Sequence, residues 1–251
     1  MKRPVSSKIK EVSGSDTGRT PPATVAEAVY RKLRSDIVWG ALPPGSRLRS
    51  DHLRVTYGVG VSPLREALSR LAAERFVISI GQRGFRVAPI DEETVRDVTE
   101  TRIIIEREAL RYSILNGELK WETSVVGAFH ALSRCPLPSA AGEGAEVWAE
   151  YHRAFHMQLL AASRSAWQQD IASQLFDQSE RFRVLLLQQP VGLGATRDIA
   201  TEHKEIVDAV LARDVDGAIS ALERHYRSTA EHVTSVLRYQ NEEENDRQRS
   251  A

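Results

Sequence analysis

The stretch Gly58-Val-Gly-Val-Ser-Pro-Leu-Arg-Glu-Ala-Leu68 predicts a break in the chain followed by a helix. A serine directly before a proline is typical of a helix start, with Ser62 as the N-cap and Pro63 in the first helical position. Apolar residues then recur at the spacing of one helix face: Leu64, Ala67, Leu68 and Leu71. This stripe should pack on the rest of a domain, which leaves Ser62, Arg65 and Ser69 facing outward.

The flanking residues complete a helix-turn-helix with a wing. Upstream, Thr24-Val-Ala-Glu27 matches a capping box for a helix that ends near Gly40, and a short helix is expected over residues 51–57. Downstream, two β-like runs at 76–80 and 85–88 are joined by a glycine-bounded basic turn, which predicts a hairpin. Residues 24–89 are therefore interpreted as a winged helix-turn-helix.

The remainder of the chain is predicted to be helical. Residues 90–240 have helix-like periodicity with short breaks and no strand-like alternation, which predicts a bundle of six or seven helices. Residues 1–23 are expected to form a disordered basic arm, and residues 241–251 a frayed polar tail. The expected fold is mainly α, with the winged domain first and the helix bundle second.

Charge is divided unevenly along the chain. The totals balance at 34 basic and 34 acidic residues, yet residues 1–90 hold 16 Lys and Arg against 7 Asp and Glu, and residues 91–251 hold 18 against 27. A basic module joined to an acidic one is typical of a protein whose first domain binds a polyanion.

Composition excludes several classes of protein and of site. The single cysteine, Cys135, rules out an internal disulfide and a multi-cysteine zinc site, so a metal would rest on histidine and carboxylate. The apolar runs are far shorter than the roughly 20 residues that a bilayer span needs, and no signal-peptide core follows the basic N-terminus. We therefore expect a cytoplasmic protein without a membrane partner.

Double-stranded DNA is the polyanion that a winged helix-turn-helix predicts. The exposed N-terminal part of the second helix can enter the major groove, where Arg65 could read guanine and Ser62 could hold a phosphate. Gln82 and Arg83 at the wing tip could reach the minor groove or the backbone, and Arg49 could contact a phosphate. The alternative for each residue alone is an ordinary solvated side chain.

Two histidines lie one helical turn apart in Trp148-Ala-Glu-Tyr-His-Arg-Ala-Phe-His156. His152 and His156 would project from the same face, with roughly 5–6 Å between their Cβ atoms, so both rings could bind one ion. A zinc hydrolase of the HExxH type would need glutamate after the first histidine, where this chain has Arg153.

A second pair of histidines can join the first. The break at residues 213–217 predicts an antiparallel helical hairpin, and His203 and His225 lie at equal distances in sequence from Asp214, so both should sit at the same height. Four converging imidazoles would suit a divalent transition metal, zinc foremost, with nickel, copper or iron as alternatives. Taken singly, each histidine is more often a hydrogen-bonded core residue than a ligand.

Arg102 interrupts an otherwise apolar row of its helix. One interpretation is a buried ion pair with Glu106 one turn on. The other is a clamp for the carboxylate of a small effector, which arginine grips with two hydrogen bonds. Arg183 is a second candidate for the same task.

The first domain resembles the DNA-binding domain of GntR-type bacterial transcription regulators. The resemblance rests on residues 28–40, Pro44-Gly-Ser-Arg-Leu48, residues 58–68 and Arg83-Gly84 in the wing, and it implies that Gly84 belongs to the DNA-contacting wing. The chain departs from the family pattern at Val61, where an arginine is usual, and at Ser50, where an acidic residue is common. The operator sequence therefore cannot be borrowed from relatives.

The helical remainder resembles the ligand-sensing FCD domain of the FadR-like branch. That resemblance implies a metal bound by an Asp-x-x-x-His pair and two later histidines, whose positions His156, His203 and His225 match. His152 stands where aspartate or asparagine is usual, so the set carries one less negative charge. The resemblance also implies a small organic acid as the effector.

The function expected from the sequence is a ligand-responsive, DNA-binding transcription regulator that works as a homodimer. The competing hypothesis is a metal-dependent enzyme that acts on small organic acids, but no motif places a general base beside the histidines. A third hypothesis, an architectural DNA-binding protein, leaves the interior histidines unexplained.

Overall fold

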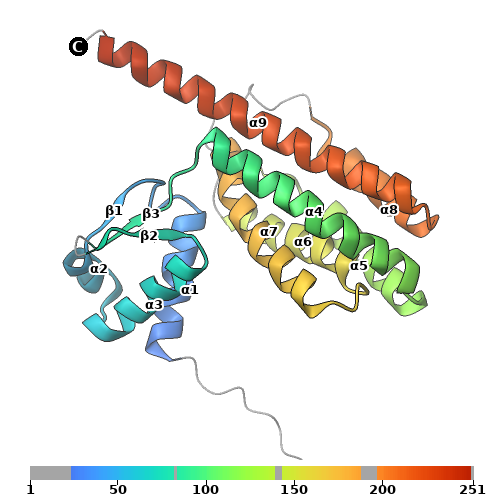
Figure 1. The fold of residues 1–251 in the computed structure, drawn as a ribbon, viewed down its shortest axis with the longest axis horizontal. Helices are drawn as coiled ribbons and strands as arrows, with labels where there is room; N and C mark the ends of the chain where they lie inside the picture. Colours follow the sequence, from blue (N-terminus) through green and yellow to red (C-terminus); the bar gives the residue numbers. More distant parts are fainter. Residues whose placement is uncertain (1–23, 82–83, 139–142, 188–196, 250–251) are drawn as a thin grey trace, which may run out of the picture.

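The computed structural model describes residues 24–81, 84–138, 143–187 and 197–249 and places them in two domains joined by a short linker (Figure 1). The first domain runs from α1 to β3, and the second is a bundle of six helices, α4 to α9. This agrees with the expected mainly α architecture. None of the described helices is both long enough and apolar enough to cross a membrane.

The first domain is a winged helix-turn-helix. Its elements are α1 (Val25–Val38), β1 (Arg47–Leu48), α2 (Ser50–Tyr57), α3 (Val61–Ala73), β2 (Val77–Ser79) and β3 (Phe85–Val87). Thr24 caps α1 by accepting a hydrogen bond from the backbone N–H of Glu27, as the capping box predicts. The hairpin of β2 and β3 is antiparallel and gains β1 as a third strand, which the sequence analysis did not identify.

The start of α3 lies two residues earlier than expected. The helix begins at Val61 with Gly60 as N-cap, so Ser62 lies in the first turn and makes no capping hydrogen bond. Pro63 is tolerated there because the first backbone N–H groups of a helix have no partner within it. The stripe of Leu64, Ala67, Leu68 and Leu71 is buried in the core of the domain, as predicted.

The second domain consists of α4 (Glu92–Asn116), α5 (Leu119–Arg134), α6 (Glu143–Leu160), α7 (Ala166–Leu187), α8 (Ile199–Leu211) and α9 (Val215–Arg249). Helix α9 lies along α4 and α8, and its last turns extend beyond the bundle (Figure 1). The expected tail from Asn241 is thus helical as far as Arg249. Its run of glutamate, glutamine and arginine contains good helix formers, which favours continuation of the helix.

Helix α7 of the bundle contacts the winged domain. The side-chain amide of Gln178 donates a hydrogen bond of 2.7 Å to the backbone carbonyl of Glu74, at the end of α3. The Arg181 guanidinium donates to the backbone carbonyl of Ala88, in the linker that follows β3. Asp177 forms an ion pair with Arg34 of α1. One face of α7 therefore anchors the winged domain at three points.

Candidate metal centre, ligand cavity and DNA-binding face

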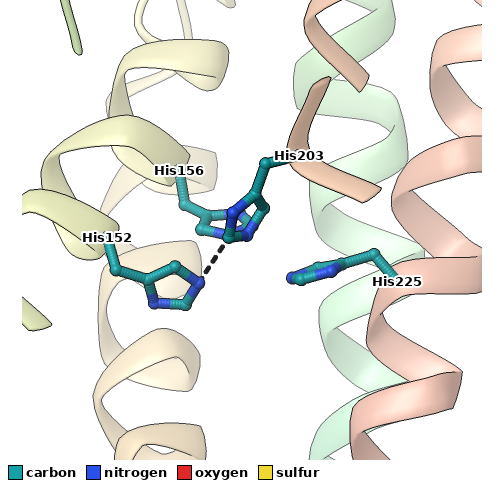
Figure 2. Close-up of side chains that lie close together, drawn as sticks. All are labelled: His152, His156, His203 and His225. Carbon is teal, nitrogen blue, oxygen red and sulfur yellow. Dashed lines mark hydrogen bonds between the residues drawn. The ribbon is translucent and has the colours of Figure 1, made fainter. Parts of the chain in front are cut away.

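Four buried histidines meet in the core of the helix bundle. His152 and His156 come from α6, His203 from α8 and His225 from α9, and all four rings point into one space (Figure 2). One nitrogen from each ring lies within 4.8 Å of the others. The hairpin of α8 and α9 brings the His203 and His225 ring centroids to 4.7 Å, as their equal distances from Asp214 predicted.

The ring nitrogens suit a metal better than a set of mutual hydrogen bonds. His152 Nε2 and His156 Nε2 lie 3.1 Å apart, and within the described residues His152 Nδ1 and His203 Nε2 have no hydrogen-bond partner. An unpartnered buried polar atom is unfavourable unless something else satisfies it. Burial lowers the pKa of all four histidines, three of them well below the usual value, so the rings stay in the neutral form that binds metals.

Two of the histidines are held by hydrogen bonds on the side away from the centre. His225 Nδ1 donates to Glu202 Oε2 at 2.7 Å, which leaves its Nε2 for a ligand. Burial alone would raise the pKa of Glu202, but hydrogen bonds from His225 and Arg197 lower it to about 2. His156 Nδ1 lies 3.1 Å from the hydroxyl of Tyr226, which itself donates to Glu106 at 2.5 Å. These contacts fix both ring orientations.

A cavity lies beside the histidines. Its volume is about 60 Å³, room for a few water molecules or a small organic molecule. His152 and His225 line one side, and the guanidinium groups of Arg102, Arg183 and Arg197 line the others. A guanidinium can bind a carboxylate with two parallel hydrogen bonds, so these arginines are candidate contacts for an anionic occupant.

Each of the three arginines is paired with a glutamate. Arg102 Nε donates to Glu106 at 2.7 Å, so the ion pair considered from the sequence is present, and the same arginine also lines the cavity. Arg183 binds both oxygens of Glu180. Arg197 binds both oxygens of Glu202 and donates to Thr229 as well. The formal charges of the three arginines and the three glutamates cancel. A bound divalent cation or anion would therefore set the net charge of the site.

Arg197 and Glu202 were missed as site residues by the sequence analysis. Arg197 lies just before α8 in a segment without periodicity, so only the fold brings it to the cavity wall. Glu202 directly precedes His203 in the chain but bonds to His225 of the neighbouring helix. A glutamate next to a candidate ligand was the one available signal, and it did not indicate which histidine would be its partner.

Four of the candidate DNA-binding residues fall within the described part of the winged domain. Arg65 and Gly84 line the same shallow groove between α3 and the wing, together with Arg54, which the sequence analysis did not select. Ser62 is exposed on the first turn of α3, and Arg49 is exposed at the start of α2. Gln82 and Arg83 lie outside the described residues, so their placement stays a prediction.

Both domains match models of known families. Residues 25–87 match the family described as bacterial regulatory proteins, gntR family, and residues 97–228 match the FCD domain. The chain is 38% identical to the uncharacterized HTH-type transcriptional regulator BphR of Paraburkholderia xenovorans (strain LB400), over 86% of this chain and 89% of that protein. It is 34% identical to the HTH-type transcriptional repressor GlaR of Escherichia coli (strain K12), over 78% and 90% respectively.

Solved structures support the fold. The Escherichia coli protein McbR/YncC has a TM-score of 0.68 at 18% identity, covering 84% of this chain and 98% of that one. A GntR family regulator from Pseudomonas syringae pv. tomato str. DC3000 has a TM-score of 0.53 at 25% identity, covering 90% and 91%. This chain thus shares its fold with both proteins.

Proposed function

The chain belongs to the gntR family of bacterial regulatory proteins, carries an FCD domain and is a DNA-binding transcription regulator rather than an enzyme. From that premise we propose that a small carboxylate effector, bound beside a divalent transition metal on the four histidines, controls its affinity for an operator. The observation that carries the proposal is the convergence of four neutral imidazoles at the wall of an arginine-lined cavity.

The metal is expected to be zinc, with nickel or iron as alternatives. Neutral nitrogen ligands suit these ions, and a set without a carboxylate adds no negative charge to the site. When bound, the ion would supply a positive charge next to the cavity. Glu202 and Tyr226 would keep His225 and His156 in the ligating orientation.

The effector is expected to be held by arginine. Arg102 and Arg183 lie at the cavity wall, and a guanidinium can bind a carboxylate with two parallel hydrogen bonds. Each guanidinium would share its donors between the effector and the glutamate that it already holds. Effector binding therefore rearranges existing ion pairs instead of filling an inert pocket.

Helix α7 supports a route from the cavity to the winged domain. Ser179 accepts a hydrogen bond of 2.7 Å from Arg102, and Arg183 of the same helix lines the cavity. Gln178, directly before Ser179 in the sequence, binds the backbone of the winged domain. A shift of α7 on effector binding would reach the DNA-binding surface through these contacts.

The active form is proposed to be a homodimer on a near-palindromic operator, with Arg65, Ser62, Arg49, Gln82, Arg83 and Gly84 at the DNA. Two recognition helices must match half-sites about one helical turn apart, so a small change in their spacing alters affinity. The name of the Escherichia coli relative, a repressor, supports repression as the mode of regulation.

Metal content is the first test. Protein purified without chelator or a metal-binding tag is expected to carry nearly one equivalent of metal, and both His203→Ala and His225→Ala should lose it. His130→Ala, at an exposed position of α5, is the matched control and should retain the metal. A folded wild type without metal would make the four histidines core residues or direct effector contacts.

Operator binding is the second test. Electrophoretic shifts with the operator should change when small organic acids are added or when metal is removed. Shifts that stay the same under every such condition would favour an architectural DNA-binding protein over a regulated one.

A further inference from the structure

His152 lacks the kind of outer hydrogen bond that orients His156 and His225. The outward nitrogens of His225 and His156 contact Glu202 and Tyr226. His152 Nδ1 is buried and has no hydrogen-bond partner among the described residues. A metal-binding histidine normally donates its second N–H to an acceptor, so His152 is incomplete as a ligand.

A possible hydrogen-bond acceptor for His152 Nδ1 lies close by but is already bound by another residue. Glu180 Oε1 lies 3.7 Å from His152 Nδ1, which is too long for a hydrogen bond. The same carboxylate is bound through both oxygens by Arg183, one turn further along α7. The His152 ring stacks on the indole of Trp148 with 4.4 Å between the ring centroids, and Arg183 Cζ lies 4.4 Å from the Trp148 ring centroid. Trp148 therefore contacts both residues.

We infer that Glu180 is a positioning residue for His152 and that Arg183 competes with His152 for its carboxylate. When Arg183 releases one oxygen, Glu180 can accept the Nδ1 proton of His152 in a hydrogen bond, and His152 Nε2 is then directed at the metal. An anion that engages Arg183 would cause that release. The inference rests on the proposed function, and it adds that effector and metal favour each other's binding.

The other two outer contacts do not offer the same exchange. The carboxylates of Glu202 and Glu106 already make short hydrogen bonds toward the histidine side, to His225 and Tyr226. Only His152 gains a new bond when an arginine gives up its glutamate. By thermodynamic linkage, the factor by which the anion raises metal affinity equals the factor by which metal raises anion affinity.

The test is a double-mutant cycle on metal affinity that needs no knowledge of the effector. Co²⁺ affinity and the Co²⁺ absorption spectrum are measured on metal-stripped full-length protein. Arg183→Met keeps an aliphatic side chain over Trp148 but frees Glu180, and it should raise affinity about tenfold, whereas Glu180→Gln should lower it about tenfold. In the double variant, Arg183→Met should give no gain over Glu180→Gln alone.

Two further variants separate this exchange from simple charge repulsion. Removing a cation near a metal could raise affinity by itself, and in that case the gain would persist in the Glu180→Gln background and overturn the inference. Arg183→Lys keeps the charge but cannot hold both carboxylate oxygens in a planar fork, so it should give part of the gain. His152→Ala should abolish the gain from either Arg183 variant.

The outcomes distinguish this inference from the proposed function. If the wild type binds no Co²⁺, both the proposed metal site and the proposed exchange are wrong. If the wild type binds Co²⁺, and Arg183→Met and Arg183→Lys bind it with the same affinity and spectrum as the wild type, only the proposed exchange is wrong. Circular dichroism verifies folding, and Arg183→Lys is the decisive variant if Arg183→Met does not fold.

Discussion

The two domains treat polar side chains in opposite ways. All thirteen buried polar or charged side chains among the described residues belong to the helix bundle, and none to the winged domain. The winged domain has an apolar core and carries its candidate DNA contacts on the surface. The bundle accepts buried arginine, glutamate and histidine, which are unfavourable unless paired. This difference agrees with the proposal that the first domain contacts DNA at its surface and that the second holds a ligand in its interior.

The largest effect expected from this contrast between the domains is the pH dependence of stability in the metal-free protein. Burial depresses the folded-state pKa of the four histidines, so the unfolded chain binds more protons below about pH 6.5. Stability present above pH 6.5 is therefore lost as pH falls. Between pH 7.5 and 5.0 the free energy of unfolding should drop by about 2 kcal/mol for each histidine that stays neutral.

Urea unfolding of chelator-treated protein at the two pH values measures this drop. His203→Ala should show a smaller drop than wild type, whereas the exposed His130→Ala should show the same drop. Glu202, with a pKa of about 2 in the folded protein, stays ionised throughout this range, and its ordinary pKa of 4.5 in the unfolded chain adds only a small further drop near pH 5. Equal unfolding free energies at both pH values would contradict the prediction.

The next largest expected effect is the difference in stability lost when a buried or an exposed ion pair is broken. Arg102→Met leaves Glu106 as an unpaired buried charge and should destabilise the protein by about 3–5 kcal/mol. Arg70→Met breaks the exposed pair with Glu27 in the winged domain and should cost no more than about 1 kcal/mol. Urea unfolding compares the two variants at pH 7.5, and equal losses would erase the contrast between the domains.

A surface residue of the winged domain should show the reverse pattern, with a loss of affinity and no loss of stability. Arg65→Ala is expected to weaken operator binding by about 1–3 kcal/mol, roughly fivefold to 150-fold, because the proposed base contact is removed. Arg31→Ala, at an exposed position of α1, is the matched control. Fluorescence anisotropy at fixed salt measures both, and equal effects would remove Arg65 from the base-reading role.

The smallest effect is expected where the two domains meet. Gln178→Ala removes the hydrogen bond to the Glu74 carbonyl and the one that Gln178 accepts from Arg181, and should cost about 1–2 kcal/mol of stability. It should also reduce the ratio of operator affinities measured with and without metal, since α7 loses an anchor on the winged domain. Gln169→Ala, whose amide bonds only to the α6–α7 connection, should leave that ratio unchanged.

The winged domain could be predicted almost entirely from local patterns. The capping box at Thr24, the apolar stripe of α3 and the glycine-bounded wing are signals within a few residues of one another. The two-residue strand β1 was missed because Arg47 and Leu48 are too few to form an alternating pattern. The helical end of α9 was missed because its residues have helix propensity without an apolar face.

The site in the bundle could be predicted only in part. The spacing of the four histidines and the equal arms around Asp214 were enough to bring the ligands together. The Arg–Glu pairs of Arg197 and Arg183 could not be foreseen in full, because Arg197 precedes its helix and the orientation of Arg183 depends on packing against α6. Local sequence identifies which residues can bind, and tertiary packing decides what each one binds.

Trp148 gives the protein a built-in optical reporter. Its indole stacks on both His152 and Arg183, whereas Trp167 is 80% exposed on α7 and Trp121 packs in the core near the α8–α9 turn. Indole emission depends on the charges and rings in contact with it, so events at His152 or Arg183 should change the intrinsic fluorescence without any label. A Trp148→Phe chain would supply the background spectrum, and the difference would follow ligand arrival in real time.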